Sequence, residues 1–208
     1  DQVISLRHSG FGGQMRHCTD LRVAKMDPAP VDTTGRIVLS TRFNAVRNLR
    51  GFRFPSACSS DERQELERVA SEALLSLTGE LKGEYFPLRG STSYKGKPHG
   101  MEQEQEERLR NARLLFQEPD SSMLLASGMG RHWPDARGIF ANEEADFAAW
   151  INEEDHLRLM IMQSGAGLAE GFLRFCRMHE TLQSALARQG HDFAHNERLW
   201  FFTSLPSN

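Results

Sequence analysis

The sequence lacks the features that mark several large classes of protein. Its 208 residues include only three cysteines, Cys18, Cys58 and Cys176, an odd number without metal-type spacing. Neither a disulfide framework nor a zinc site is therefore indicated. No run of about 18 apolar residues occurs, and residues 1–13 show no basic head followed by an apolar stretch. We expect a protein of the reducing cytoplasm with no membrane anchor and no signal peptide.

An excess of charge of either sign is also missing. Lys and Arg total 25 against 28 Asp and Glu, which gives a formal net charge of -3 and a pI near 6.3. This balance gives no electrostatic reason to expect nucleic acid or an anionic membrane as a partner. Hydrophobic residues make up 39% and charged residues 25%, as in ordinary globular proteins, so one domain is the default expectation.

The two ends of the chain indicate a piece of a longer protein. The chain begins at Asp1 without an initiator Met, and it stops at residues 206–208 directly after an apolar run. Residues 1–35 mix Gly, His, Pro and charge without a clear period, and the prolines at 28 and 30 favour extended or turned backbone. We interpret 1–35 as a linker or lead-in segment and 36–208 as one folded domain.

Three stretches have helical patterns. Ser59 and Glu62 form a capping box, and apolar residues follow at helical spacing, so a helix is predicted over 60–78. A second helix is predicted over 167–189, with Gly190 as its stop signal. The segment 101–113 is dense in Glu, Gln and Arg, which is typical of an exposed helix with a solvated charged face.

Short apolar runs predict strands outside these helices. They cover 36–43, 147–151, 157–162 and 199–203. The second and third runs are joined by a short acidic loop, which favours paired strands. Strands and helices do not alternate regularly, so the expected fold class is α+β, with a mainly antiparallel sheet flanked by helices.

The acidic loop is the first candidate for chemistry. It reads Asn152-Glu153-Glu154-Asp155-His156 and places three consecutive carboxylates at the end of an apolar segment, where repulsion and desolvation oppose them. A compensating cation is expected, such as a magnesium-bound nucleotide or a cationic substrate, and a positioned carboxylate is a plausible base for a guanidinium nitrogen. A plain exposed hairpin turn fits the same spacing, because acidic residues are common in turns.

A basic stretch from Ser40 to Arg47 is the second candidate. Arg42 and Arg47 lie near a predicted strand end, and forked arginine donors bind phosphate oxygens bidentately at any relevant pH. A structural or idle pair of surface arginines is the alternative. No Walker-type Gly-rich loop and no Rossmann fingerprint is present to offer a competing phosphate site.

The third candidate is the turn-rich stretch from Ser127 to Ile139. Trp133 there is either a core residue or part of a site, since a Trp beside a proline often serves packing. Arg131 has two possible partners, a phosphate group or Asp135. The sequence pattern does not decide between them.

Together these motifs resemble the guanidino (phosphagen) kinases, in order and spacing from about residue 3 to the last residue. The acidic loop followed by Leu157 and Arg158 resembles the signature loop of that family. Residues 127–139 resemble its SGMxRxWPDARGI segment, and residues 77–88, LTGELKGEYFPL, are also close. Residues 3–8 and Gly190-His191 look more like the creatine kinase branch than the arginine kinase branch.

The resemblance implies a two-lobed enzyme that moves the γ-phosphoryl group of MgATP reversibly onto a guanidino nitrogen. The chain would be its ATP-binding catalytic lobe, incomplete at the C-terminus, and a homodimer is possible. Glu154 matches the carboxylate that deprotonates the guanidinium, and Glu153 matches one that meets magnesium through water. The implied catalytic set is Glu153, Glu154 and Asp155, and the implied ATP- and phosphate-binding set is Ser40, Arg42, Asn44, Arg47, Arg113, Trp133 and Arg158.

Three positions depart from the family pattern. The phosphate strand of the family carries RxR, and its second arginine is Asn44 here. The reactive cysteine before the final PSN is Leu205, and a histidine before LLF is Arg113. An active kinase with creatine as the favoured acceptor and arginine next is the leading hypothesis. The alternatives are a degenerate homologue that retains nucleotide binding or an interaction role, and a protein arginine kinase, because residues 47–52 also resemble that group.

Overall fold

A computed structural model describes residues 29, 31–196 and 200–204 of the chain. Most of the lead-in segment expected over 1–35 lies outside these residues, as do Leu199 of the predicted strand 199–203 and Leu205. No helix in the described ranges has the length and apolar character needed to cross a membrane.

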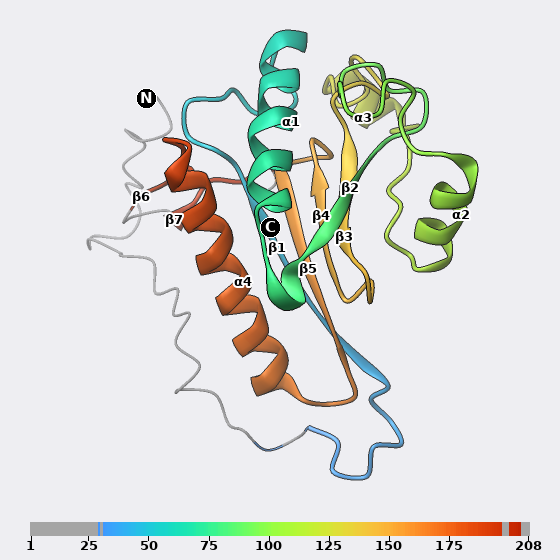
Figure 1. Ribbon diagram of the computed structural model, residues 1–208, viewed down its shortest axis with the longest axis vertical. Coiled ribbons are helices and arrows are strands. Elements are labelled where there is room, and N and C mark those ends of the chain that lie inside the picture. The colour runs from blue at the N-terminus through green and yellow to red at the C-terminus, as the bar shows by residue number, and fades with distance from the viewer. Residues whose placement is uncertain (1–28, 30, 197–199, 205–208) are drawn as a thin grey trace.

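A five-stranded antiparallel sheet forms the centre of the domain (Figure 1). Its strand order is β1-β5-β4-β3-β2, so β1 and β2 are the two edge strands. The predicted α+β class with an antiparallel sheet flanked by helices is confirmed. The strand bounds are Ser40–Arg47 for β1, Gly83–Pro87 for β2, Gly138–Asn142 for β3, Phe147–Ile151 for β4 and Leu157–Ser164 for β5.

Two helices, α1 (Ser60–Leu75) and α4 (Leu168–Arg188), cover one face of this sheet (Figure 1). The predicted capping box of α1 is present: the Ser59 hydroxyl accepts from the Glu62 N–H, and the Glu62 carboxylate accepts from the Ser59 N–H. Gly171 lets α4 lie close to β1, because a Cβ there would lie 2.3 Å from the Phe43 ring. The sequence therefore located both long helices to within about three residues.

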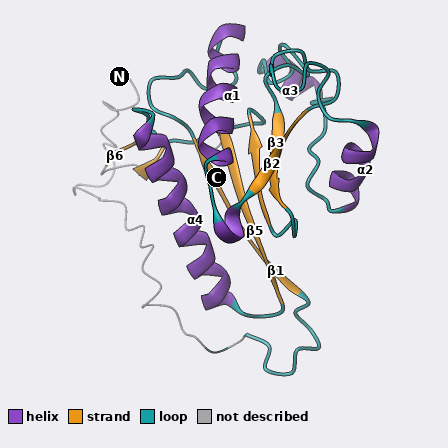
Figure 2. Cartoon of the chain, in the orientation of Figure 1, coloured by secondary structure: helices purple, strands orange, loops and turns teal. Residues whose placement is uncertain are grey.

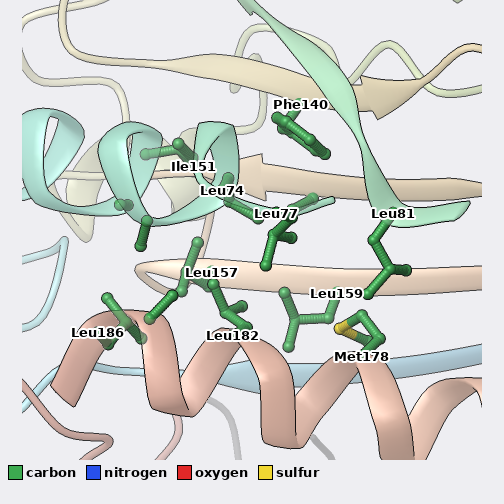
Figure 3. Close-up of a cluster of buried hydrophobic side chains, with 14 of the residues drawn as sticks. Leu74, Leu77, Leu81, Phe140, Ile151, Leu157, Leu159, Met178, Leu182 and Leu186 are labelled. Carbon is green, nitrogen blue, oxygen red and sulfur yellow. The ribbon is translucent and has the colours of Figure 1, made fainter. Parts of the chain in front are cut away.

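The main hydrophobic core lies between these helices and the sheet (Figure 3). Burial of this apolar surface supplies most of the favourable free energy of folding. The strands contribute alternate residues to it, since neighbouring side chains of a strand point to opposite faces. The residues labelled in Figure 3 are Leu74, Leu77, Leu81, Phe140, Ile151, Leu157, Leu159, Met178, Leu182 and Leu186.

The opposite face of the sheet is covered in part by α2 (Gln103–Asn111) and the segment that follows it (Figure 1). The predicted charged helix is confirmed, and Leu109 is its one buried residue. A second apolar cluster forms there between β2, β3, β4 and the residues after α2. The cover does not extend to β1, where Arg42 and Asn44 are exposed. One part of this face is therefore open.

The remaining elements are short, and Figure 2 shows how loops join them. They are the 3₁₀ turn Gly79–Leu81, the helix α3 (Ser122–Ala126), and a separate two-stranded ribbon of β6 (His195–Asn196) and β7 (Trp200–Phe201). The strand predicted over 199–203 is thus reduced to β7, which pairs with β6 and does not join the main sheet. Strands β2 and β3 were not predicted, because neither has a clean alternating pattern.

The first strand begins four residues later than the predicted 36–43. The Asp32 carboxylate accepts the N–H groups of Ile37 (2.7 Å) and Val38 (3.0 Å), which holds this stretch in a turn. Ile37 and Leu39 are 82% and 80% exposed, so the β-branched run that predicted a strand does not lie in the sheet. Side chain to backbone hydrogen bonds of this kind compete directly with strand pairing.

Candidate functional site

The acidic loop 152–156 joins β4 to β5 as a tight hairpin turn. The Asn152 N–H donates to the His156 carbonyl (3.0 Å), and Asn152 takes a positive φ of 58° that asparagine tolerates. The Asn152 side chain is fully buried and donates to the carbonyls of Arg63 (3.1 Å) and Ala136 (2.7 Å). The loop is therefore tied to α1 and to the start of β3, and the solvated-turn alternative does not describe it.

His156 holds the end of the loop as a neutral ring. Its Nδ1 accepts the Leu49 N–H at 2.9 Å, so the proton is on Nε2, which lies 2.9 Å from the Arg53 carbonyl and donates to it. Burial lowers the pKa of His156 from 6.5 to about 4. At neutral pH the ring is uncharged, and its role here is structural.

Asp155 points away from the two glutamates. It is 2% exposed, and its Oδ1 accepts from Asn48 Nδ2 and from the Ser204 N–H, both at 2.6 Å. The sequence analysis grouped Asp155 with Glu153 and Glu154 as catalytic. The structure separates it from them, because its carboxylate is fixed inside the protein, whereas both glutamates line an open cavity.

Arg158 supplies the cation that the carboxylates were expected to need. Its Nε lies 3.3 Å from Glu153 Oε2, and its Nη2 lies 3.1 Å from Glu154 Oε2. Burial raises the pKa of Glu154, the neighbouring Glu153 raises it further, and Arg158 opposes both. A carboxylate with a raised pKa, held by an arginine and still accessible, is suited to accept a proton.

A cavity of about 390 Å³ opens in front of the two glutamates. It lies on the face of the sheet opposite α1 and α4, beside the second apolar cluster. Its wall combines aromatic, aliphatic and acidic side chains, as is common in sites for small organic ligands. The lining residues are Leu115, Phe116, Gln117, Glu118, Pro119, Asp120, Leu124, Met129, Trp133, Arg137, Trp150, Glu153 and Glu154.

Aromatic rings make one wall of this cavity rigid. Phe116 contacts Trp150 with ring centroids 5.2 Å apart and Trp133 at 6.0 Å. The indole N–H of Trp150 donates to the Leu114 carbonyl at 2.6 Å, and the Arg158 guanidinium lies 5.6 Å from the Trp150 ring. Trp150 thus contacts both the aromatic wall and the arginine that holds the glutamates.

Arg137 adds a buried cation behind the same cavity. Its Nη2 donates to the carbonyls of Met129 (2.7 Å) and Arg131 (2.9 Å), and its guanidinium lies 5.2 Å from the Trp133 ring. Burial first, and then the nearby charge of Arg63, lower the pKa of Arg137 to about 9. A cation in such surroundings makes the electrostatic potential of the cavity more favourable for an anion.

Arg42 and Asn44 lie on the same face of the sheet as the cavity. In the register of β1 with β5, Asn44 pairs with Met160, and Val46 pairs with Arg158. Alternation therefore puts the even-numbered positions of β1 on the Arg158 side of the sheet. Arg42 is exposed and its Nη2 reaches Met160 Sδ at 2.6 Å, so its side chain extends along the strand toward Arg158.

Arg47 lies on the other face and does not join this group. Its Nε donates to His179 Nε2 on α4 at 2.9 Å, and its guanidinium lies 3.6 Å from the Phe201 ring. It is 7% exposed, and burial lowers its pKa to about 10. The structure thus places this predicted phosphate ligand in the helix-covered half of the protein, where odd-numbered positions of β1 point.

Ser40 and Arg113 also stand apart from the cavity. Ser40 is exposed and pairs with Ser164 at the end of β1 far from the acidic loop. Arg113 follows α2 as an exposed residue with a φ of 58°, and it does not line the cavity. Of the predicted set, Glu153, Glu154 and Trp133 line the cavity, and Arg158 joins its two glutamates.

The sequence analysis missed Trp150, Phe116, Arg137 and Asn48. Trp150 could have been found from the sequence, since it lies in the strand predicted over 147–151. Its side chain must point to the face opposite that of the core residues Phe147, Ala149 and Ile151. Arg137 lay within the third candidate stretch but was not singled out. Phe116 and Asn48 acquire their roles only through contacts distant in sequence, which no local pattern reveals.

The paired carboxylates are the groups that fit a magnesium ion here. No cluster of three or more His, Cys, Asp or Glu suited to a metal occurs within the described ranges. Mg²⁺ is usually held by one or two carboxylates together with waters and substrate phosphates, so one carboxylate at the cavity wall, such as that of Glu153, fits the part that the protein would supply. The oxygen donors and accessibility of the paired carboxylates are compatible with such an ion.

Comparisons with known proteins point to one family. A family model described as "ATP:guanido phosphotransferase, C-terminal catalytic domain" matches residues 65–208. The chain is 41% identical to creatine kinase M-type of Oryctolagus cuniculus and 39% identical to that of Homo sapiens, in both cases over all 208 residues. These matches cover 100% of this chain and 52% of each relative, so the chain spans about half the length of the curated relatives it matches.

Solved structures agree with the sequence comparisons. The structure of a lombricine kinase superposes with a TM-score of 0.83 at 37% identity, covering 93% of this chain and 50% of that one. A substrate-free duplicated taurocyamine kinase from Schistosoma mansoni gives a TM-score of 0.80 at 34% identity, covering 97% of this chain and 26% of that one. The likeness therefore extends over nearly the whole described domain.

Proposed function

The chain belongs to the ATP:guanido phosphotransferase family, and on this basis we propose that it is the ATP-binding catalytic lobe, residues 36–208, of a guanidino kinase. The whole protein would transfer the γ-phosphoryl group of MgATP reversibly to a guanidino nitrogen. The observation that carries the proposal is the pair Glu153 and Glu154, which lines the cavity and is held by Arg158.

Glu154 is the proposed general base. Its raised pKa and its place at the cavity wall suit a carboxylate that accepts a proton from the guanidino nitrogen. As the N–P bond forms, the bond between the γ-phosphorus and the bridging oxygen breaks and ADP leaves with its electron pair. In the reverse direction, Glu154 returns the proton. Little covalent chemistry is required of the protein, since positioning and charge neutralisation supply most of the acceleration.

The proposed phosphate contacts come from Arg158 and Arg42 on the open face of the sheet. Both belong to the same face as the cavity, and Arg158 already contacts the carboxylates that meet the reacting groups. Glu153 would hold magnesium through water, and the ion would neutralise phosphate oxygens of the nucleotide. Trp133 on the aromatic wall is the proposed nucleotide contact.

Creatine is the proposed acceptor and arginine is the next candidate. Support for creatine is the 41% identity with creatine kinases, while the lombricine and taurocyamine kinases among the structural relatives show how readily the acceptor varies in related proteins. A cytoplasmic location and a homodimer complete the proposal. Size-exclusion chromatography with light scattering tests the dimer.

An assay of ADP formation with creatine, arginine, taurocyamine and glycocyamine tests the activity. The whole protein, of which this chain is the proposed catalytic lobe, should turn over at least one of these acceptors. Glu154→Gln should lower kcat by about 10²–10⁴-fold, because the amide cannot accept the proton. Glu104→Gln, an exposed acid on α2, serves as the control and should leave kcat unchanged. Absence of turnover with all four acceptors would refute the proposed activity.

A degenerate homologue that binds nucleotide without turnover is the second candidate. The observation that favours it is Asn44, which lies on the open face beside Arg42 where the family pattern has an arginine. Losing one charged ligand of the transferring group typically lowers the rate by about a hundredfold or more. If no acceptor is turned over but ATP still raises the melting temperature, this candidate replaces the first.

A further inference from the structure

Asn48 connects three parts of the chain that meet behind the acidic loop. It is 1% exposed and follows directly after β1. Its Oδ1 accepts the His156 N–H at 2.8 Å, and its Nδ2 donates to Asp155 Oδ1 at 2.6 Å. Both side-chain atoms of one buried residue thus hold consecutive residues of the loop that carries Glu153 and Glu154.

The same amide reaches the C-terminal ribbon of β6 and β7. Asn48 Nδ2 also donates to the Phe202 carbonyl at 3.0 Å, and the Asn48 carbonyl accepts the Ala194 N–H at 2.7 Å. Asp155 completes the connection, because its Oδ1 accepts the Ser204 N–H. The ribbon and the acidic loop therefore share Asn48 and Asp155 as their common support.

Arg47 fixes the ribbon at the adjacent position. Its guanidinium lies over the Phe201 ring, and His179 on α4 accepts its Nε–H. Residues 47 and 48 consequently contact the last residue of the ribbon, Phe201, and the residue that follows it, Phe202. The end of β1, the ribbon and the acidic loop form one hydrogen-bonded unit that packs on α4.

We infer that Asn48 and Asp155 are positioning residues for the proposed phosphoryl transfer, which hold Glu154 in its productive place by joining the acidic loop to the C-terminal ribbon. The inference rests on the proposed function, and it takes Asp155 out of the chemistry. Buried polar groups that are fully satisfied make a structure rigid, and a misplacement of about 1 Å can lower a rate about a hundredfold.

The first test compares two buried asparagines. Asn48→Ala should lower kcat by about a hundredfold and change the KM for ATP by less than about threefold, since Glu154 moves while the open face of β1 keeps its place. The matched control is Asn142→Ala, at the opposite end of β4. Asn142 is also buried, at 3% exposed, and its Oδ1 accepts the N–H groups of Asp146 and Phe147. Equal losses of kcat in both variants would overturn the inference.

The second test separates positioning from chemistry at Asp155. Asp155→Asn keeps an Oδ1 that accepts from Asn48 and from the Ser204 N–H but removes the charge. It should retain kcat within about threefold of the unmodified protein, whereas Asp155→Ala should lose about a hundredfold. A folded Asp155→Asn protein as inactive as the alanine variant would show that the charge itself acts in the reaction. If an alanine variant does not fold, Asp155→Asn decides alone.

A third measurement does not depend on activity. Amide hydrogen exchange at His156 and Ser204 should be faster in Asn48→Ala than in Asn142→Ala. The Asn48 variant removes the oxygen that accepts the His156 N–H, and it removes the hydrogen bond that holds Asp155, the acceptor of the Ser204 N–H. Unchanged exchange at both amides would overturn the inference even in an active enzyme. Faster exchange in a protein that turns over no acceptor would support the link between the acidic loop and the C-terminal ribbon through Asn48. The proposed activity would then fail by itself.

Discussion

The two faces of the sheet differ in what they do with charge. The face covered by α1 and α4 buries an apolar core, and its one strand cation, Arg47, contacts a neutral histidine and a phenylalanine ring. The other face carries Arg42, Arg158 and the glutamates beside a cavity. The same strand thus places one arginine in the packed interior and leaves another exposed on the open face.

This difference shows that strand alternation, more than residue type, decides which arginine can take part in the site. Arg42 and Arg47 are five positions apart, so they point to opposite faces of β1. Arg47 cannot replace the charge that is missing at Asn44, because the whole thickness of the sheet separates them. Substitutions on the face covered by α1 and α4 should accordingly change stability, and substitutions on the open face should change activity.

The largest expected effect concerns the face of the sheet covered by α1 and α4, which we call the closed face. Leu159→Ala removes a fully buried side chain between β5 and α4, and we expect a loss of about 2–5 kcal/mol in the free energy of unfolding. Asn44→Ala on the open face should change it by less than about 0.5 kcal/mol. Urea unfolding of both variants measures the contrast. Similar losses would show that the open face also supports the fold.

Acidification should weaken both the acidic loop and the packing of β1 on α4, because each depends on a neutral histidine. Burial lowers the pKa of His156 and of His179 from 6.5 to about 4. The unfolded chain therefore binds more protons between these values, and stability falls as the pH drops from about 6.5 toward 4. Each histidine contributes up to about 1.4 kcal/mol per pH unit.

Denaturant unfolding at several pH values measures this slope. His179→Gln keeps an acceptor for Arg47 but cannot titrate, so the slope should fall by the contribution of His179. An unchanged slope in that variant would mean that protonation of His179 does not cause the loss of stability at low pH.

Arginine variants test the separation of the faces directly. Arg42→Met should lower kcat/KM by about a hundredfold, as expected when a charged ligand of the transferring phosphoryl group is lost. Arg47→Met should leave the dissociation constant for ATP within about twofold. Steady-state kinetics and calorimetric titration provide the two values. Weaker ATP binding in Arg47→Met with an intact fold would contradict the assignment of Arg47 to the closed face.

The smallest expected effect is that of introducing a positive charge at position 44. Asn44→Arg should raise kcat/KM about tenfold or more, because the side chain would point to the open face beside Arg42. Asn44→Lys is the matched control, and it should gain less because an ammonium lacks the forked donors. No gain in either variant would show that the missing arginine does not limit the rate.

Local patterns were enough for part of this structure. The capping box at Ser59 and the apolar stripes located α1 and α4, and the two apolar runs around the acidic loop gave the hairpin of β4 and β5. In each case the hydrogen bonds that define the element join residues close in sequence. The antiparallel class followed from the same short segments.

Other features depend on contacts between distant residues, and they were missed or misplaced. β1 pairs with β5 across more than a hundred residues. Its start was misplaced for a local reason, the turn at Asp32, which an apolar pattern does not reveal. Asp155 looked like its two neighbours in sequence, yet its partners are Asn48 and Ser204. No spacing rule distinguishes a carboxylate that faces a cavity from one that faces the protein interior.

The position of β1 at the edge of the sheet affects which substitutions can accumulate during evolution. Arg42 and Asn44 are exposed on a strand with one neighbour, so replacing either leaves folding almost undisturbed. Selection against unfolded protein does not act on such positions. A single mutation that adds or removes an arginine there can therefore persist while the domain remains folded.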